Sequence, residues 1–290
     1  MAPASPGDLP SFELLEESAD LPVYALPERL ATAYAGTLGF GSPCLYANFV
    51  ESVDGVVSFG PELPSAGGLI SGDSPADRFL MGLLRACADT VLLGAGTLRG
   101  SPGHRWTPEH VFPAAAEEYA ALRRFLGRRP IPRLALISAG GDFDVQHTGL
   151  LPGTVIFTGD AGAARLRGRL GPGVAVRSLG DDSSLSMHRV VEELRKDGDL
   201  AILSEGGPSV LGQLLRAGLV DDLFLTLAPT ILGRSATEQR LGLVEATLFT
   251  PGAAPQLDLR SVRRHRSHLF LRYGIGLDGQ ASTRGSSITP

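Results

Sequence analysis

Two glycine-rich segments of the chain have the composition of a phosphate-binding site. The first, Gly94-Ala95-Gly96-Thr97, follows an apolar run, and the second, Gly206-Gly207-Pro208, follows another apolar run that ends in Glu205. Glycines let a backbone approach a phosphate or ribose closely, and Thr97 adds a hydroxyl. Pro208 suits the first turn of a helix, where free N–H groups favour an anion. We predict a nucleotide site here, with a merely tight strand-to-helix turn as the alternative for the first segment.

Glu205 is an unexpected residue beside an anion site. A carboxylate at this position is unfavourable unless it accepts hydrogen bonds from hydroxyls or amines of a ligand. The alternative interpretation is a charge at the start of a helix, favoured by the helix dipole. The two glycine turns together with Glu205 indicate a nucleotide and a second ligand that carries hydroxyls.

The residues at two other expected strand ends favour NADPH over NADH. Ser138 and Thr158 end these strands, and Arg165, Arg167 and Arg169 follow soon after. An NAD site usually has an acidic residue at such a strand end, where it binds the ribose hydroxyls. Hydroxyls and arginines instead suit a 2′-phosphate, so we predict that Ser138 and Thr158 contact the cofactor.

The composition excludes several other classes of protein. The chain has 290 residues, a net charge of −5, 43% hydrophobic and 20% charged residues, which is ordinary for a globular protein and unsuited to nucleic acid. No run approaches the roughly 20 apolar residues of a membrane span, and the N-terminus lacks a secretory signal. Cys44 and Cys87 suit reduced core thiols, and the six histidines form no metal motif. We expect a cytoplasmic protein without a metal.

Strands and helices alternate from Cys44 onward, which predicts an α/β fold with a mainly parallel sheet covered on both faces. The expected strands are Cys44–Val50, Asp89–Gly94, Arg133–Ser138, Thr154–Thr158, Val174–Arg177, Asp199–Ser204 and Asp222–Leu227. The expected helices are Leu26–Gly36, Phe79–Ala88, Ala114–Phe125, Ala161–Leu170, His188–Lys196 and Gly207–Ala217. Two further strands, Gln256–Arg263 and Ser267–Tyr273, are expected to lie antiparallel at one edge.

Three regions follow from this organisation. Residues 1–42 are acidic and rich in proline and glycine, and we expect an arm that packs on the domain or on a partner subunit. Residues 43–275 form the expected α/β domain. Residues 276–290 have the composition of a flexible tail.

Six short motifs occur in an order that is specific to one family. They are Ser52–Gly55, Leu69–Gly72, Leu84–Asp89, Val91–Thr97, Ser204–Pro208 and Leu223–Gly233. From about Cys44 to Tyr273, the chain resembles the pyrimidine reductase domain of riboflavin biosynthesis. The resemblance implies a dihydrofolate reductase-like fold and a homodimer. It also implies hydride transfer from NADPH to an imine-like carbon of a ribosylamino-pyrimidine phosphate, without a metal.

The resemblance also implies roles for individual residues. Gly94, Ala95, Gly96 and Thr97 would contact the nicotinamide half of NADPH, and Gly206, Gly207 and Pro208 would hold its phosphates. Ser71 and Asp77 would lie against the cofactor, and Ser138 near its adenosine end. Arg85 and Glu205 match positions on the substrate side.

The chain departs from the family pattern where the substrate would bind. Asn48 stands where the family usually has lysine, and Ser101-Pro-Gly-His-Arg-Trp106 replaces an Asp-Asp-Pro or Asp-Asn-Pro motif. Asn48, Ser101 and Arg105 are therefore our candidates for substrate binding, with Arg99, Arg105 or Trp106 as substitutes for the missing groups. The expected substrate is a pyrimidine, a pteridine or a related heterocycle. No zinc deaminase signature accompanies the reductase motifs.

Reduction of an imine also needs a proton, and Asp54 and Glu205 are the candidates, directly or through water. Asp54 is equally well interpreted as a turn residue that binds nearby backbone. Two other hypotheses for the whole chain stay open: a reductase of the same fold that uses a deazaflavin, and a relative that binds nucleotide without turnover.

Overall fold

The computed structural model describes residues 9–60, 66–180, 185–235, 237 and 239–276. Its ten-stranded sheet has the order β1-β9-β10-β8-β2-β7-β3-β4-β5-β6. Neighbours from β8 to β6 are parallel, whereas β10, β9 and β1 continue the sheet as antiparallel strands. The predicted mixed α/β fold with antiparallel edge strands is therefore confirmed. Of the tail predicted for residues 276–290, Gly276 is the last residue of a strand, and residues 277–290 lie outside the described residues.

All the predicted strands and helices are present, and the described residues also contain one strand in the N-terminal arm and three short helices that were not predicted. The strands are β1 Glu13–Glu17, β2 Cys44–Ser52, β3 Thr90–Gly94, β4 Arg133–Ile137, β5 Val155–Thr158, β6 Ala175–Ser178, β7 Ala201–Ser204, β8 Asp222–Ala228, β9 Gln256–His265 and β10 His268–Gly276. The helices are α1 Glu28–Tyr34, α2 Ala66–Ser71, α3 Pro75–Cys87, α4 Ala95–Arg99, α5 Pro108–Val111, α6 Ala116–Phe125, α7 Asp160–Leu166, α8 Met187–Lys196 and α9 Pro208–Arg216, with 3-10 turns η1 Pro113–Ala115 and η2 Pro251–Ala253.

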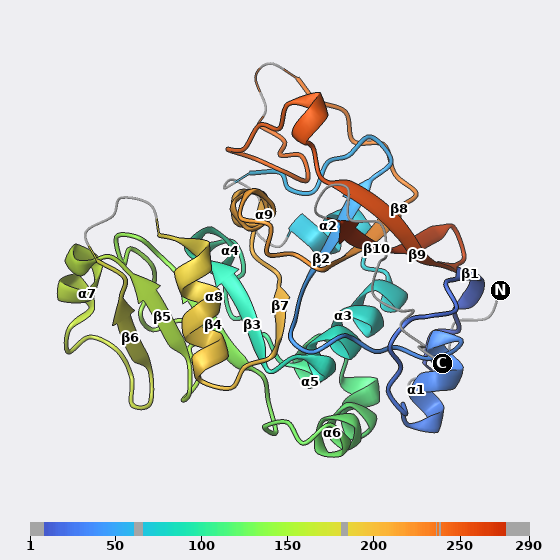
Figure 1. Cartoon of the computed structure of the whole chain (residues 1–290), viewed down its shortest axis with the longest axis horizontal. Helices are drawn as coiled ribbons and strands as arrows, with labels where there is room; N and C mark the ends of the chain where they lie inside the picture. The colour runs from blue at the N-terminus through green and yellow to red at the C-terminus, as the bar shows by residue number, and fades with distance from the viewer. Residues whose placement is uncertain (1–8, 61–65, 181–184, 236, 238, 277–290) are drawn as a thin grey trace, which may run out of the picture.

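Helices cover both faces of the parallel strands (Figure 1). One core packs α8 and α9 against side chains such as Leu45, Leu92 and Ile202. The other packs α1, α3 and α6 against Tyr46 and Leu203, among others. Side chains alternate between the two faces along each strand. Residues two apart on one strand therefore line the same core, which decides which site residues can meet.

Helix α3 places two charged side chains inside the protein. The Ser74 hydroxyl accepts a hydrogen bond from the Asp77 N–H and Pro75 occupies the first turn, so the helix start is well defined. Asp77, near this start, and Arg85, near the end, are both buried. Their burial on a helix that covers the sheet shows that each needs a local partner.

The N-terminal arm packs on the sheet of its own chain. Strand β1 pairs with β9, and the buried Phe12 ring lies 4.7 Å from the Phe270 ring, centroid to centroid. Arg263 binds Glu17 at 2.5 Å between Nη2 and Oε2. The sequence analysis expected a helix in this arm but no strand. The burial pattern explains this, because β1 is exposed on both faces and has no apolar alternation.

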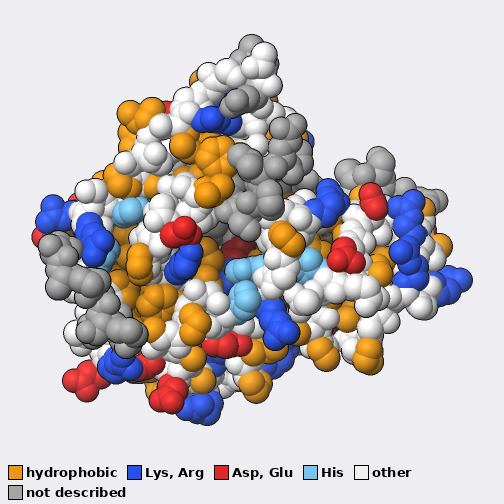
Figure 2. Space-filling view, turned by 180° about the vertical axis from the view of Figure 1, so that it is seen from behind, with side chains coloured by type: hydrophobic (Ala, Val, Ile, Leu, Met, Phe, Trp, Pro, Cys, Tyr) orange, Lys and Arg blue, Asp and Glu red, His pale blue; other side chains and the backbone are white. Residues whose placement is uncertain are grey.

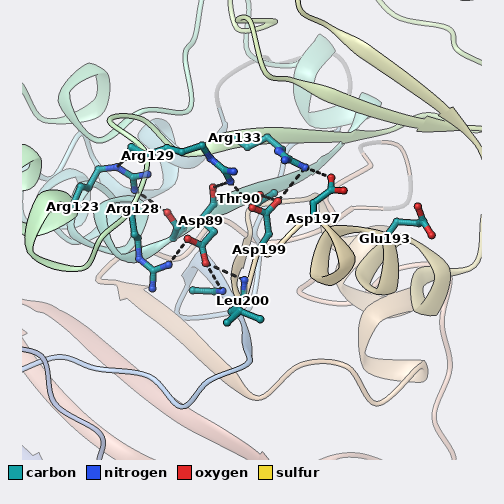
Figure 3. Close-up of polar contacts among 12 residues, drawn as sticks. Asp89, Thr90, Arg123, Arg128, Arg129, Arg133, Glu193, Asp197, Asp199 and Leu200 are labelled. Atoms are coloured by element: carbon teal, nitrogen blue, oxygen red, sulfur yellow. Dashed lines mark hydrogen bonds and ion pairs between the residues drawn. The ribbon is translucent and has the colours of Figure 1, made fainter.

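An ion-pair network ties together the amino ends of β3, β4 and β7 (Figure 3). Asp199, whose side chain is 1% exposed, pairs with Arg129 and Arg133 and accepts a hydrogen bond from the Thr90 hydroxyl at 2.7 Å. Asp89 pairs with Arg128 and accepts the N–H groups of residues 200 and 201. These contacts stabilise the sheet at the edge opposite to the strand ends described next.

Candidate active site

The two predicted glycine turns lie side by side at the carboxyl ends of β3 and β7, which are neighbouring parallel strands. β3 leads into α4 at Gly94, and β7 leads to α9, whose N-cap is Gly207. A Cβ placed on Gly207 would lie 3.6 Å from the Thr97 hydroxyl oxygen. Open parallel sheets bind ligands at such strand ends. The fold thus brings together two segments that are about a hundred residues apart.

The four glycines of these turns have different reasons to be glycine. A Cβ on Gly94 or Gly206 would meet the Val210 side chain at 2.9 or 2.6 Å, so close packing of α9 accounts for both. A Cβ on Gly96 would meet nothing within 4 Å. On Gly207 its only neighbour among the described residues would be the Thr97 hydroxyl. Gly96 and Gly207 therefore border open space that a ligand can occupy.

Helix α9 begins without a side-chain cap. Gly207 is its N-cap, Pro208 follows in the first turn, and no side chain of the described residues binds its first N–H groups. Nearby, the Ser204 hydroxyl is buried without a described hydrogen-bond partner. Uncapped N–H groups at a helix start bind anions such as phosphates. The local chemistry fits the phosphates of a nucleotide.

Glu205 and Arg85 form a two-point ion pair inside the site. Arg85 Nη2 lies 2.7 Å from Glu205 Oε2, and Nε lies 2.9 Å from Oε1. The two side chains are only 2% and 9% exposed, respectively. Two parallel N–H···O bonds fix the plane of the carboxylate as well as its charge. Glu205 is therefore held in one orientation beside the glycine turn.

All five N–H donors of Arg85 have partners. Besides Glu205, the guanidinium donates from Nη1 to the carbonyl oxygens of Arg105 and Thr107 and from Nη2 to His104 Nε2 at 3.2 Å. A guanidinium has five donors and no acceptor. In this structure all donors of Arg85 are engaged and its guanidinium holds the Glu205 carboxylate, while the substrate contact of Arg85 stays a prediction.

Polar side chains line the α3 face of three adjacent strands. Asn48 pairs with Phe224 of β8, and Ala47 pairs with Ser204 of β7, so Asn48 and Glu205 are next to each other across the sheet. Thr226 lies on the same face of β8, two residues beyond Phe224. Asn48 is half-buried, while the Thr226 hydroxyl is buried without a described hydrogen-bond partner. Asn48 is thus placed to contact a ligand that binds against Glu205.

Asp77 lies at the end of this polar row. Burial raises the pKa of Asp77 to about 6, an effect opposed by the nearby hydroxyls of Thr226 and Ser71 and reinforced by the Glu205 charge. Ser71 is buried at the end of α2, and its hydroxyl donates to the Gly68 carbonyl oxygen at 3.2 Å. The structure brings the predicted residues Ser71 and Asp77 together beside Glu205.

Asp54 lies in a different environment. Its Oδ1 accepts the Ser52 hydroxyl at 2.6 Å and the Leu232 N–H, and its Oδ2 accepts the Gly233 N–H at 2.6 Å. The Ser52 bond and these two backbone bonds lower the pKa of Asp54 to about 2. A carboxyl that is ionised above pH 3 and bound on both oxygens anchors the loop after β8. This geometry supports the turn interpretation, and a catalytic role for Asp54 stays a prediction.

Ser138 and Thr158 lie at the carboxyl ends of β4 and β5, away from Glu205. Thr158 is fully buried, and its hydroxyl donates to the Ala139 carbonyl oxygen at 3.0 Å. Two arginines bind the loop between these residues, Arg165 at the Gly140 carbonyl and Arg99 at the Asp142 carbonyl. Direct contacts of Ser138 and Thr158 with a cofactor remain predictions. The side chains of Arg99 and Arg165 are exposed, whereas those of Ser138 and Thr158 are buried.

The loop that replaces the family motif lies over Arg85. Arg105 is exposed, and Ser101 is half-buried with its carbonyl oxygen 2.9 Å from His147 Nε2. Trp106 is buried and packs against Gly149, so it is a core residue and offers no free face for stacking. Figure 2 shows histidine side chains gathered in the middle of this face. The sequence analysis missed His104, because only the fold shows that it binds Arg85.

Two properties of the described residues bear on other functions. No group of three or more His, Cys, Asp or Glu side chains in the described ranges is arranged to hold a metal ion. Among the same residues, no helix combines the length and the apolar character needed to cross a bilayer.

The fold and the paired glycine turns define an α/β protein with a candidate ligand site at the ends of its parallel strands, and comparison places it in one family. Residues 43–271 match the family of the RibD C-terminal domain, so the chain belongs to this family. The family resemblance seen in the sequence is thereby confirmed. Among curated proteins, none matches the chain by sequence.

Solved structures with the same fold include a reductase-like protein and two reductases. A pyrimidine reductase-like protein from Corynebacterium diphtheriae is 25% identical with a TM-score of 0.64, over 88% of this chain and 96% of that one. The riboflavin biosynthesis reductase Rib7 of Saccharomyces cerevisiae is 16% identical with a TM-score of 0.56, over 84% and 94%. A deaminase/5-amino-6-(5-phosphoribosylamino)uracil reductase of Thermotoga maritima is 17% identical with a TM-score of 0.53, over 81% of this chain but only 57% of its own. The chain therefore belongs to the family of the RibD C-terminal domain and shares its fold with solved reductases.

Proposed function

We propose that the chain is a cytoplasmic NADPH-dependent reductase of a pyrimidine, a pteridine or a related heterocycle. The observation that carries the proposal is the open space at Gly96 and Gly207, bordered by the uncapped start of α9 and adjacent to Glu205. In this proposal Gly94–Thr97 and Gly206–Pro208 hold the dinucleotide, and bound NADPH supplies the hydride. Reductase relatives of the same fold support the assignment.

The side chains around Glu205 then have separate tasks. The Glu205 carboxylate, held in place by Arg85, accepts hydrogen bonds from hydroxyls or amines of the substrate. Asn48, beside it, offers an amide that donates and accepts. Because the pKa of Asp77 is about 6, part of the population carries a proton at neutral pH. Asp77 thus suits the holding and delivery of a proton better than Asp54, whose pKa is about 2.

Cofactor binding is the first test. Calorimetry should show that NADPH binds more tightly than NADH. Gly96→Ala should bind NADPH at least about tenfold more weakly, because a methyl group occupies ligand space. The same change replaces a glycine inside α4, which should keep or slightly raise the stability of the fold. Failure of the wild-type chain to bind NADPH would exclude the proposal and favour another donor, such as a deazaflavin.

Turnover is the second test. The probe substrate is 5-amino-6-(5-phosphoribosylamino)uracil, on which the Thermotoga maritima relative acts, followed by pteridines. Loss of NADPH absorbance that requires the probe supports the proposal. Glu205→Gln should keep NADPH affinity and impair turnover. Tight NADPH binding without turnover of any heterocycle would instead indicate a nucleotide-binding relative that is not an enzyme.

We also propose a homodimer. Leu257 and Leu259 on β9 are 45% and 39% exposed, and Leu271 and Tyr273 on β10 are half-buried. An apolar sheet surface of this kind is typical of a subunit contact. Light scattering at micromolar concentration tests this state, and a monomer would contradict it.

A further inference from the structure

The loop after α4 supplies the partners of Arg85 that Glu205 does not. The carbonyl oxygens of Arg105 and Thr107 each lie 3.4 Å from Nη1, and His104 Nε2 lies 3.2 Å from Nη2. Two of the three partners are therefore backbone groups, which any sequence could provide. His104 is the one side chain among them, and it completes the five donors of a guanidinium whose side chain is 2% exposed.

The protonation state of His104 follows from this contact. Arginine only donates, so the His104 Nε2 atom must be the acceptor and carry no proton. The ring proton is then on Nδ1. Burial, followed by the charge of Arg85, lowers the pKa of His104 to about 3, with smaller effects from His110 and His147. His104 is consequently a neutral acceptor throughout the physiological range of pH.

A second set of contacts holds the loop in place. The His147 Nδ1 atom accepts the Gly149 N–H at 3.0 Å, so its Nε2–H donates to the Ser101 carbonyl oxygen at 2.9 Å. The Trp106 ring packs directly against Gly149. A Cβ on Gly149 would lie only 2.7 Å from Trp106 Cζ3, so a larger residue would not fit. The His104 ring lies edge-on to Trp106 at 5.0 Å. The loop is thus fixed from one side by His147 and Gly149, and His104 presents its free nitrogen to Arg85.

We propose that His104 is a positioning residue of this site, which orients Glu205 by binding the remaining N–H of Arg85. The inference rests on the proposed reductase function, in which Glu205 contacts the substrate. His104 itself need not touch substrate or cofactor. Without its acceptor, Arg85 Nη2 keeps one unpartnered N–H, and the guanidinium can turn in its plane to find another acceptor. The carboxylate bound to it then loses the orientation that turnover needs.

Two neutral amides separate this role from simple packing. In His104→Gln, the side-chain oxygen reaches the position of Nε2 and can still accept from Arg85. In His104→Asn, the shorter side chain has its amide near the position of Nδ1 and leaves Nη2 without an acceptor. Both variants remove the imidazole and its contact with Trp106. If the role of His104 were purely structural, both substitutions would therefore lower kcat to a similar degree.

The kinetic test uses 5-amino-6-(5-phosphoribosylamino)uracil with saturating NADPH. We expect kcat to fall about tenfold in His104→Asn, the equivalent of one hydrogen bond to a charged group. In His104→Gln we expect a change within about threefold. The Kd for NADPH should be the same in both variants, because the cradle at Gly96 and Gly207 is untouched. Equal loss of kcat in both variants, or none in either, overturns the inference.

A measurement without substrate separates this inference from the proposed function. Nitrogen-15 NMR of histidine-labelled protein, assigned with His104→Gln, reports the tautomer and charge of His104. We expect a neutral ring with the proton on Nδ1 at pH 5. A protonated Nε2 or a cationic ring at that pH overturns the role of His104 even if the enzyme is active. If the wild-type chain fails to turn over the probe, the substrate proposal fails, while the NMR result still decides whether His104 binds Arg85.

Discussion

Glu205 at the end of β7 and Arg85 on α3 are held by a two-point ion pair, with 2.7 Å between Nη2 and Oε2 and 2.9 Å between Nε and Oε1. The pair joins the strand that leads into the glycine turn to the helix that covers it. Both side chains are almost completely buried. Each charge therefore depends on the other, and removal of one leaves the other without its counter-charge in a poorly solvated place.

This dependence predicts a strong coupling between the two residues. Arg85→Met should reduce the free energy of unfolding by about 3–5 kcal/mol, because it leaves a buried carboxylate unpaired. Adding Glu205→Leu to this variant should restore part of that loss, with a coupling energy of at least about 1 kcal/mol in a double-mutant cycle measured by urea unfolding. Additive effects would show that the pair is not formed in solution. The double variant should not regain turnover.

The glycines of the two turns predict a contrast between stability and binding. A Cβ on Gly206 would lie 2.6 Å from Val210, so Gly206→Ala should destabilise the fold by about 1–3 kcal/mol through overpacking of α9. Gly96→Ala is the matched control, because its Cβ meets nothing within 4 Å. Thermal unfolding with and without NADPH measures both effects. Equal unfolding temperatures of the two apo variants would contradict the packing of α9 described above.

Asp77 predicts a dependence of stability on pH. Burial raises its pKa in the folded protein to about 6 from an ordinary value of 3.8, so the folded state binds the proton more tightly than the unfolded state. The stability contributed by this group is full below about pH 4 and is lost as pH rises through 6. The loss is at most about 3 kcal/mol. Asp77→Asn should remove this loss and gain stability relative to wild type at pH 7.5.

Urea unfolding at pH 4.5 and 7.5 measures the difference. The control is Asp54→Asn, because the pKa of Asp54 is about 2 and its charge is the same at both pH values. Its stability should therefore shift from wild type by the same amount at both. If the difference in stability between Asp77→Asn and wild type is also the same at both pH values, the Asp77 carboxyl does not have the raised pKa in solution.

The network at the opposite edge of the sheet predicts loss of stability without loss of binding. Asp199 is buried between Arg129 and Arg133, at the amino ends of the strands. Asp199→Asn should cost about 2–3 kcal/mol, less than a fully buried pair because both arginines are partly exposed. The Kd for NADPH should not change. Glu192→Gln, which breaks an exposed pair with Lys196 on α8, is the control and should leave the unfolding curve unchanged.

The sequence predicted those parts of the site that depend on residues close together in the chain. It did not predict the contacts between residues far apart in the chain. Gly96 and Gly207 were found because strand, glycine and helix follow one another locally, and the rule that ligands bind at the ends of parallel strands joins the two turns. Asp54 was ambiguous because its partners, the N–H groups of Leu232 and Gly233, follow almost 180 residues later. His104 was missed for a similar reason. A histidine at this position of the sequence does not reveal that the fold places its ring against Arg85.

Strand β1 shows the same limit for the fold. Its pairing with β9 joins segments about 250 residues apart, and its exposed faces provide no periodic signal. The buried residue just before the strand carries the energy. Phe12 is 4% exposed and its ring lies within 6 Å of those of Tyr34, Phe79 and Phe270. The arm is therefore part of the core that also contains α3.

This integration predicts unequal effects of two substitutions in the arm. Phe12→Ala should reduce the free energy of unfolding by about 3–5 kcal/mol, because it empties a site between three aromatic rings. Leu15→Ala, on a side chain that is 48% exposed, should change it by less than about 0.5 kcal/mol. Chemical unfolding followed by tyrosine and tryptophan fluorescence measures both. If Phe12→Ala were as stable as wild type, residues 9–42 would pack loosely on the sheet, and the support that they give to α3, and through it to Arg85, would be absent.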